Sequence, residues 1–334
     1  MKKRIALGLM LAMVLSAAAC GSKTPEEPAQ SEPAAEAEEP DKAPEESGGN
    51  KEITIGVVVN SLEHVYFNRI KAAMEAEADA LGVKLELIDG AGDSAVQLSA
   101  VQDFIAEGVD AICVAFCQTD GSSSMVELAN DAGIPFFTFD VQADGGEVVS
   151  YCATDNYAGG RLAAQYCLEN ILTDKTGNCV IIPYDEVESC RNRAKGFEDY
   201  MKENAPDMQV TSIASFSGDR LTAYSNFQDA LTSIGAENID FVFGVGDDAV
   251  LGAITACEEA NVEIPMIGLD GNPEAEKNVA AGGMFKADVA QDAAGIGKTT
   301  IDNVVAYLNG ETVEAEVLIT PTMITPENAD PNVQ

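Results

Sequence analysis

Polar side chains follow five apolar segments of the sequence, at the points where predicted strands end. They are Asn60 and Ser61, Asp140, Tyr184 and Asp185, Asp247, and Asp270. Carboxylates, amides and hydroxyls can pair with the hydroxyl edge of a small polar ligand, often through charge-assisted hydrogen bonds. In open sheets of parallel strands, ligands bind beyond the carboxyl ends of the strands. We therefore predict one ligand site at this edge.

Enzyme signatures are absent from the sequence, which contains no G-x-S-x-G, no H-E-x-x-H and no P-loop. The looser G-x-G-x-x-A occurs at 90–95 and 244–249, but it places Asp where a pyrophosphate would lie. A single histidine, His64, makes any His-built zinc site or Ser-His-Asp triad depend on one residue. We expect no catalytic residue, no cofactor and no metal, with a carboxylate-based glycosidase as a remote alternative.

Short apolar segments alternate with helix-length amphipathic segments from residue 51 onward. The predicted strands are 53–59, 84–88, 111–116, 135–139, 179–183, 209–214, 240–245, 265–269 and 285–290. The predicted helices include 66–81, 95–107, 157–172, 193–204, 221–233, 248–260 and 292–308. Strands that read as buried on both faces, alternating with helices, predict an α/β fold of two Rossmann-like lobes with parallel sheets.

The composition is strongly acidic, with 19 Lys and Arg against 56 Asp and Glu and a formal net charge of −37. Such a chain repels the phosphates of nucleic acids and anionic membrane surfaces, so we expect no nucleic-acid partner. Hydrophobic residues make up 46% of the chain, which is enough to bury a core. A folded body of about 300 residues is long for one core and also predicts two lobes.

The first residues have the pattern of a secretory signal, with a basic start at 2–4 and an apolar run at 5–15. Small residues then precede Cys20, as in a bacterial lipoprotein signal, which predicts a signal peptide over 1–19 and a lipid on Cys20. A soluble secreted protein, cleaved at an Ala-x-Ala site, is the alternative. Residues 20–50 form an acidic linker rich in Pro, Glu and Ala that cannot bury a core.

Seven further cysteines lie in the predicted folded body: Cys113, Cys117, Cys152, Cys167, Cys179, Cys190 and Cys257. An odd number cannot all pair internally, so at least one thiol stays free. No C-x-x-C pair and no zinc spacing occurs among them. We expect them to be small core residues of an exported protein.

Several segments resemble the ribose-type sugar-binding proteins of ABC importers, which are class I periplasmic binding proteins. They are, in order, IGVVVNSLEHVYFNRIKAAMEAEADALGVKLELID, IPFFTFDVQ, ATDNYAGGRLAAQY, SCRNRAKGF, GVGDDAVLGAI, MIGLDGNPEAEKNVAAGG and ADVAQ. The resemblance covers nearly all of 52–310. It implies two lobes joined by three hinge crossings, near Thr154–Asp155, Gln291–Asp292 and Thr320–Pro321. The N-terminal lobe would be 51–154 plus 292–320, and the C-terminal lobe 155–291 plus 321–334.

The resemblance also implies which residues contact the ligand. On the first lobe they are Asn60, His64, Tyr66, Phe67 and Asp140; on the second lobe and hinge they are Arg193, Asp270 and Gln291. We add Asp247, which could instead cap helix 248–260. Asp140 and Asp270 could likewise be turn or cap carboxylates, and Tyr66 and Phe67 could be core residues.

Three positions depart from the family pattern. Val141 replaces an arginine, Gly218 replaces an aromatic residue that nearby Phe216 could substitute, and Gly246 replaces an asparagine. The pocket is therefore expected to be more acidic and more spacious than a ribose pocket, which admits another pentose or hexose, a polyol or an amino-bearing sugar.

The implied partners are a sugar or polyol, an ABC permease and its ATPase, and a membrane reached only through the Cys20 lipid. We expect a monomer, exported and lipid-anchored on the outer side of the cytoplasmic membrane. The same binding could instead serve a tethered sensor that presents the ligand to a chemoreceptor or sensor kinase. The sequence does not separate these two roles.

Overall fold

A computed structural model of the chain describes residues 52–333. The predicted signal peptide, the lipidation of Cys20 and the linker over 20–50 lie outside the described residues. None of the helices within 52–333 is both long and apolar enough to cross a membrane.

The first lobe is built on a sheet with the strand order β11-β5-β4-β3-β1-β2. Its strands are β1 (Thr54–Val59), β2 (Lys84–Asp89), β3 (Ala111–Val114), β4 (Phe136–Phe139), β5 (Val148–Thr154) and β11 (Glu316–Ile319). All neighbouring strands run parallel. The central strands are almost wholly apolar and buried, as expected of a sheet covered by helices on both faces.

The second lobe repeats this plan with the strand order β12-β10-β9-β8-β6-β7. Its strands are β6 (Asn178–Ile182), β7 (Gln209–Ser212), β8 (Phe241–Gly244), β9 (Met266–Asp270), β10 (Phe285–Ala290) and β12 (Thr322–Ile324). Only β12 is antiparallel to its neighbour. The aromatic side chain of Phe197 stacks on Phe241 and Phe243 in the core of this lobe.

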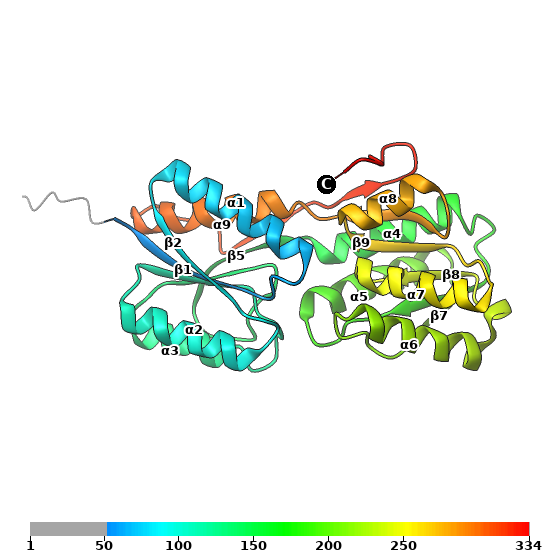
Figure 1. Cartoon of the computed structure of the whole chain (residues 1–334), viewed down its shortest axis with the longest axis horizontal. Helices are drawn as coiled ribbons and strands as arrows, with labels where there is room; N and C mark the ends of the chain where they lie inside the picture. Colours follow the sequence, from blue (N-terminus) through cyan, green and yellow to red (C-terminus); the bar gives the residue numbers. More distant parts are fainter. Residues whose placement is uncertain (1–51, 334) are drawn as a thin grey trace, which may run out of the picture. The chain divides into compact units, whose positions relative to one another are not determined.

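Helices cover both faces of each sheet (Figure 1). They are α1 (Val65–Leu81), α2 (Ser94–Glu107), α3 (Ser123–Asp131), α4 (Asn156–Asn170), α5 (Glu188–Asn204), α6 (Arg220–Ala230), α7 (Asp247–Ala260), α8 (Pro273–Ala281) and α9 (Ala293–Leu308). In the first lobe, α1 and α9 pack together on one face, and α2 and α3 cover the other (Figure 1). In the second lobe α4 packs along α5, and α6 along α7.

The chain passes between the two sheets three times. It leaves the first sheet after β5 and returns after β10 to form α9, which packs against β4 and β5. It crosses again between β11 and β12, where only residues 320 and 321 separate the two strands.

Every predicted strand and helix is present, with shifts of a few residues at the ends. The list of elements was incomplete, however, because β5, β11, β12, α3 and α8 were not predicted. The helix expected at 193–204 begins earlier, at Glu188. Its first turn was not predicted, because the segment before Arg193 is polar and shows no apolar periodicity. The seven cysteines of the described residues are all buried and unpaired, as expected of small core residues.

Candidate functional site

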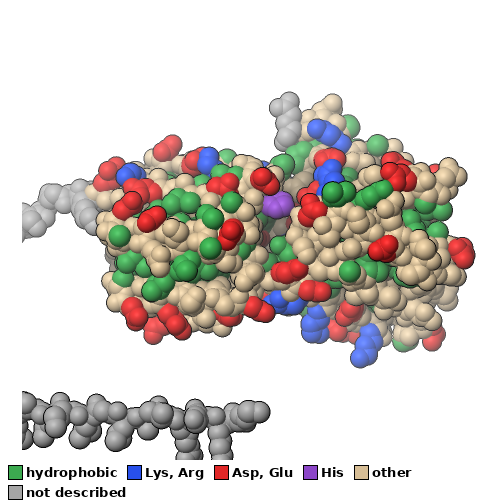
Figure 2. Space-filling view, turned by 60° about the horizontal axis from the view of Figure 1, so that its bottom comes forward, with side chains coloured by type: hydrophobic (Ala, Val, Ile, Leu, Met, Phe, Trp, Pro, Cys, Tyr) green, Lys and Arg blue, Asp and Glu red, His purple; other side chains and the backbone are tan. Residues whose placement is uncertain are grey.

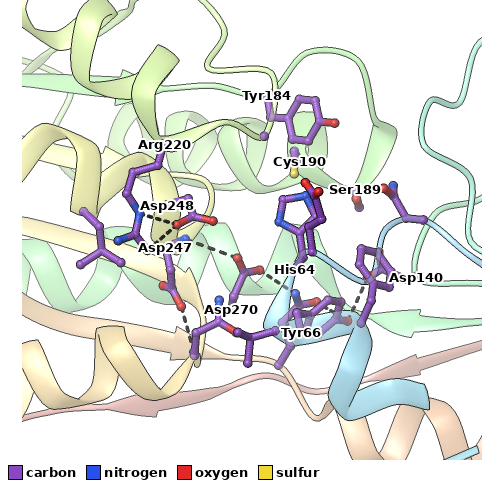
Figure 3. A pocket seen from close by; sticks show the side chains of 18 of the residues that line it. His64, Tyr66, Asp140, Tyr184, Ser189, Cys190, Arg220, Asp247, Asp248 and Asp270 are labelled. Carbon is purple, nitrogen blue, oxygen red and sulfur yellow. Dashed lines mark hydrogen bonds and ion pairs between the residues drawn. The ribbon is translucent and has the colours of Figure 1, made fainter. Parts of the chain in front are cut away.

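One cavity of about 600 Å³ is lined by residues from both lobes. All nine side chains that the sequence analysis singled out lie on its wall: Asn60, His64, Tyr66, Phe67, Asp140, Arg193, Asp247, Asp270 and Gln291. Its volume is in the usual range for a site that encloses a small molecule. Figure 3 shows carboxylates, aromatic rings and the histidine converging on the same space.

The first turn of α1 supplies an aromatic wall. Tyr66 and Phe67 are 6% and 7% exposed, and their rings meet edge to face with centroids 5.3 Å apart. His64 occupies the N-cap position of α1 without a capping side-chain bond, and its ring lies 6.5 Å from that of Phe67. Asn60, at the end of β1, donates its amide N–H to the Phe116 carbonyl at 2.9 Å, which fixes this side chain at the wall.

Asp140 follows β4 and has a left-handed backbone conformation, with φ of 60°. Its backbone N–H donates to the Cys152 carbonyl at 2.9 Å, and this bond helps to hold an unfavourable conformation in place. The Tyr66 hydroxyl donates to the Asp140 carboxylate at 2.9 Å. Burial raises the pKa of Asp140 to about 6, and the charge of Asp270 adds to the shift, although Arg193 and Tyr66 oppose it.

Arg193 is the guanidinium of the inner cavity and is 4% exposed. Its Nε donates to the Asn156 side chain at 2.7 Å, and its Nη1 donates to the Val245 carbonyl at 2.8 Å and to Asp270 at 2.9 Å. These bonds lock the side chain in one orientation. The contact between Asn156 and Arg193 could not be predicted from the sequence. The two residues are 37 positions apart, and they meet only because α4 packs on α5.

Asp270 ends β9 and is the centre of the hydrogen-bond network between the lobes. Its Oδ1 accepts from Arg193 and also from Gln291 Nε2 at 2.8 Å. The Gln291 side-chain carbonyl oxygen lies 3.2 Å from the Tyr66 hydroxyl. The second oxygen of Asp270, Oδ2, accepts the backbone N–H of Asp247 at the start of α7 at 3.3 Å, so this carboxylate also serves the end of that helix.

Asp247 is 1% exposed and lies at the start of α7, but its side chain does not cap that helix. The carboxylate accepts the Asn272 backbone N–H at 2.8 Å. Burial, followed by the neighbouring charges of Asp288 and Asp270, raises the pKa of Asp247 well above its ordinary value. Asp288, fully buried behind the wall, has a pKa raised to about 7 by burial. Asp247 Oδ1 and Asp288 Oδ1 are both buried without a hydrogen-bond partner among the described residues, which disfavours the charged form of each group.

A second aromatic pair lines the opposite wall; Phe216 was anticipated as a substitute for the aromatic residue replaced by Gly218, but the ring of Tyr184 was not. Tyr184, after β6, meets Phe216 edge to face with ring centroids 5.4 Å apart. A Cβ at Gly218 would lie 3.1 Å from the Tyr184 ring, so glycine makes room for Tyr184 where an aromatic residue was expected. Tyr184 was recognisable as a polar residue at a strand end, but its ring could not be placed from sequence.

Charged side chains surround the cavity, and acids outnumber bases. Glu63, Asp248 and Glu274 lie on its wall together with Arg220 and Lys277. Arg220 is already paired, because it donates to Asp248 at 2.7 Å and to both Glu274 oxygens at 2.9 and 2.8 Å. Figure 2 shows the histidine between the two lobes, with acidic side chains close by.

Direct bonds join the lobes on both sides of the cavity. Arg69, on α1, donates to the Gly271 carbonyl at 2.8 Å. Thr119, from the first lobe, accepts the Glu188 backbone N–H at 3.0 Å and donates its own N–H to the Glu186 carbonyl at 3.3 Å. Helix α5 has no side-chain cap from its own N-cap residue, Val187, so Thr119 satisfies that helix end from the other lobe.

This arrangement is suited to binding. Aromatic faces on both walls can pack on apolar C–H surfaces, and oriented carboxylate, amide and guanidinium groups can pair with hydroxyls. Among residues 52–333, no group of three or more His, Cys, Asp and Glu side chains is arranged to hold a metal ion.

Comparison with known proteins gives a consistent result. The family described as "Periplasmic binding protein domain" matches residues 55–312. The ribose import binding protein RbsB of Bacillus subtilis is 32% identical over 278 residues, which is 82% of this chain and 88% of that protein. The Escherichia coli protein of the same name is 31% identical over 268 residues, covering 79% and 87% of the two chains.

Solved structures agree with the sequence comparisons. A galactofuranose binding protein superposes with a TM-score of 0.77 at 26% identity, covering 83% of this chain and 96% of its own. A solute binding protein of Bacillus halodurans with bound myo-inositol gives a TM-score of 0.76 at 27% identity, covering 85% and 98%. These relatives are binding proteins rather than enzymes. The chain belongs to the periplasmic binding protein family.

Proposed function

We propose that this protein captures a sugar or a sugar-like polyol between its two lobes and delivers it to an ABC importer. The observation that carries the proposal is the single cavity that brings together all nine predicted contact residues from both lobes. The printed names of the relatives, which include ribose import and galactofuranose binding, support this class of ligand.

The chemistry of the walls supports a polyhydroxylated ligand. A sugar presents hydroxyls at its edge and C–H groups on its faces. The Tyr66–Phe67 and Tyr184–Phe216 pairs offer ring surfaces on opposite walls. Arg193 and Asp270 offer a charged donor and acceptor for hydroxyl groups. A site built in this way rejects ligands that lack hydroxyls, because each buried group left unpaired costs roughly 1–3 kcal/mol.

Capture would occur by closure of the lobes. We assign the N-terminal lobe to 51–154 plus 292–320 and the C-terminal lobe to 155–291 plus 321–334, with hinges at the three crossings. The ligand contacts both lobes only in the closed form, and it shifts the equilibrium by its difference in affinity for the two forms. The closed lobes would then present the surface that the permease and its ATPase recognise.

The proposed location is the outer side of the cytoplasmic membrane. A lipid on Cys20 would hold the exported protein there, and residues 20–50 would act as a spacer. Tethering raises the effective concentration of the binding protein near its permease.

A thermal-shift panel tests the binding function. The purified chain is heated with pentoses, hexoses, polyols, amino sugars, nucleosides and amino acids. A ligand at about 100 times its dissociation constant stabilises by about 2.7 kcal/mol, which corresponds to a rise in melting temperature of roughly 5–10 °C. A large shift within the sugar and polyol classes supports the proposal. A response confined to nucleosides or amino acids would contradict it.

A further inference from the structure

The inner cavity carries more negative than positive groups. Asp140, Asp247 and Asp270 line it, and Arg193 is the one Lys or Arg side chain of the described residues that is buried on its wall. Arg193 is committed to Asp270 at 2.9 Å. Asp247 accepts the Asn272 backbone N–H through Oδ2, while its Oδ1 is buried without a hydrogen-bond partner among the described residues and is influenced by the charge of Asp288.

Asp140 differs from these two carboxylates in its surroundings. It is 5% exposed, yet within residues 52–333 no Lys, Arg or His nitrogen lies at ion-pair distance from it. Its one side-chain bond to a described residue is to the neutral Tyr66 hydroxyl, which donates to Oδ1. The next residue is Val141, which is apolar and 2% exposed. The second oxygen, Oδ2, thus has no hydrogen-bond donor among the described residues, and Asp140 lines the cavity.

Hydrogen-bond donors are also too few around Tyr66. Its hydroxyl lies 2.9 Å from Asp140 Oδ1 and 3.2 Å from Gln291 Oε1, and both of these atoms are acceptors. A phenol has one proton to donate, so it can satisfy only one of them. Gln291 Nε2 donates one of its two N–H groups to Asp270, and this bond turns the amide so that Oε1 lies toward Tyr66. The charge of Arg193 acts on Asp140, but no Lys, Arg or His side chain of residues 52–333 lies at ion-pair distance, and the acceptors of this corner outnumber its donors.

We propose that the ligand carries a protonated amine and that Asp140 binds it, so that the substrate is an aminodeoxy sugar or an amino polyol. This inference rests on the proposed function and names its ligand class. An ammonium group has three N–H donors and no acceptor. One N–H can reach Asp140 Oδ2 and another Gln291 Oε1, while Tyr66 keeps its bond to Asp140 Oδ1. The ligand hydroxyls then meet Arg193 and Asp270.

The electrostatics of the wall support this assignment. A buried carboxylate whose pKa is raised to about 6 is poorly compensated by its own protein, and a cation beside it would reverse that shift. The outer wall adds Glu63, Asp248 and Glu274 against Arg220 and Lys277. A wall with this excess of acids attracts cations and disfavours anionic sugars such as sugar acids and sugar phosphates.

Matched ligand pairs test the proposal by titration calorimetry on the purified chain at about pH 7, where the amine is protonated. Each pair is an amine and its hydroxyl parent: glucosamine and glucose, galactosamine and galactose, an aminodeoxyinositol and myo-inositol. N-Acetylglucosamine serves as a neutral analogue. We expect at least one amine to bind about tenfold or more tightly than its parent, and acetylation to remove the gain. Asp140→Asn should erase the preference, and Asp207→Asn, which removes an exposed acid that does not line the cavity, should leave it unchanged.

The outcomes separate this inference from the proposed function. If the hydroxyl parents bind the unaltered protein as tightly as the amines, the amine inference is wrong and the sugar-binding function stands. If the preference persists in Asp140→Asn, the assignment to Asp140 is wrong. If no sugar, polyol or amine binds, the proposed function fails as well. The ligand pairs on the unaltered chain decide the question even if Asp140→Asn does not fold.

Discussion

The contact between α4 and α5 links the packing of the second lobe to its binding site. A Cβ added at Gly160 would lie 1.9 Å from the Arg193 carbonyl oxygen, and one at Gly196 would lie 2.1 Å from the Tyr157 carbonyl oxygen. The two backbones therefore touch at both positions. We predict that Gly160→Ala both destabilises the protein and weakens ligand binding, because it pushes on the residue that holds Asp270.

The magnitude follows from the distances. Ordinary contact begins near 3.4 Å, so α4 and α5 must separate by about 1.5 Å to admit the methyl group. Overpacking of this kind costs about 1–3 kcal/mol, and the upper end is expected because backbone resists the shift more than a flexible side chain. For a chain of this size, about 3 kcal/mol lowers the melting temperature by roughly 6–12 °C. A comparable shift would lengthen the 2.9 Å bond from Arg193 to Asp270 beyond hydrogen-bond range.

The assay combines thermal unfolding with titration of a ligand found in the panel. Gly283→Ala is the matched control, because a Cβ there meets nothing within 4 Å. It should change the free energy of unfolding by less than about 1 kcal/mol. A Gly160→Ala protein with the control's melting temperature and the unaltered protein's affinity would refute the argument that close approach of α4 and α5 positions Arg193.

The structure or the sequence also predicts the effects of three further substitutions. The pKa of Asp288 rises from an ordinary 3.8 to about 7 in the folded protein, so its protonated form stabilises the fold at low pH and this contribution is lost as the pH rises toward about 7. Asp288→Asn should therefore flatten the decline of the free energy of unfolding between about pH 4 and 7, measured by denaturant titration. Thr119→Val removes the hydroxyl that accepts the Glu188 backbone N–H and so caps helix α5 from the first lobe. Loss of such a cap costs about 1 kcal/mol, so the dissociation constant measured by calorimetry should rise about fivefold. Cys20→Ala should move the protein from the membrane pellet to the soluble fraction of fractionated cells.

Each of these expectations has an outcome that contradicts it. Identical pH profiles for the unaltered protein and Asp288→Asn would show that this carboxyl group does not titrate as described. Thr211, exposed on β7, is the control for Thr119, and equal affinities of the two valine variants would remove the role of the cap. A Cys20→Ala protein that still pellets with membranes would exclude the lipid as the anchor.

Much of the fold could be predicted because buried parallel strands read as apolar runs and their helices keep a regular period. The elements that were missed have weaker signals. Strands β11 and β12 are short and largely exposed, and the apolar stripe of α8 holds only Ala275 and Val279 as buried residues. Strand β5 is followed directly in the sequence by the polar residues that begin α4, so the end of the strand is hard to recognise from the sequence. These elements are specified by tertiary contacts more than by local sequence.

The candidate site could be anticipated as a set of strand ends, because parallel strands bring their carboxyl ends to one edge. What the sequence could not give was how those residues pair. The bond of Arg193 to Asn156 depends on the packing of two helices, and the raised pKa values of Asp247 and Asp288 depend on burial behind the wall. The ring of Tyr184 fills the space beside Gly218 through a contact between separate loops.

A crystal structure of the chain grown with the strongest ligand of the panel tests the central claim most directly. The account predicts one ligand molecule in the cavity between the lobes, stacked on the Tyr66–Phe67 wall and hydrogen-bonded to Arg193 and Asp270. Its amine, if it has one, should lie beside Asp140. Ligand density elsewhere on the protein, or density that contacts one lobe only, would contradict capture between the two lobes.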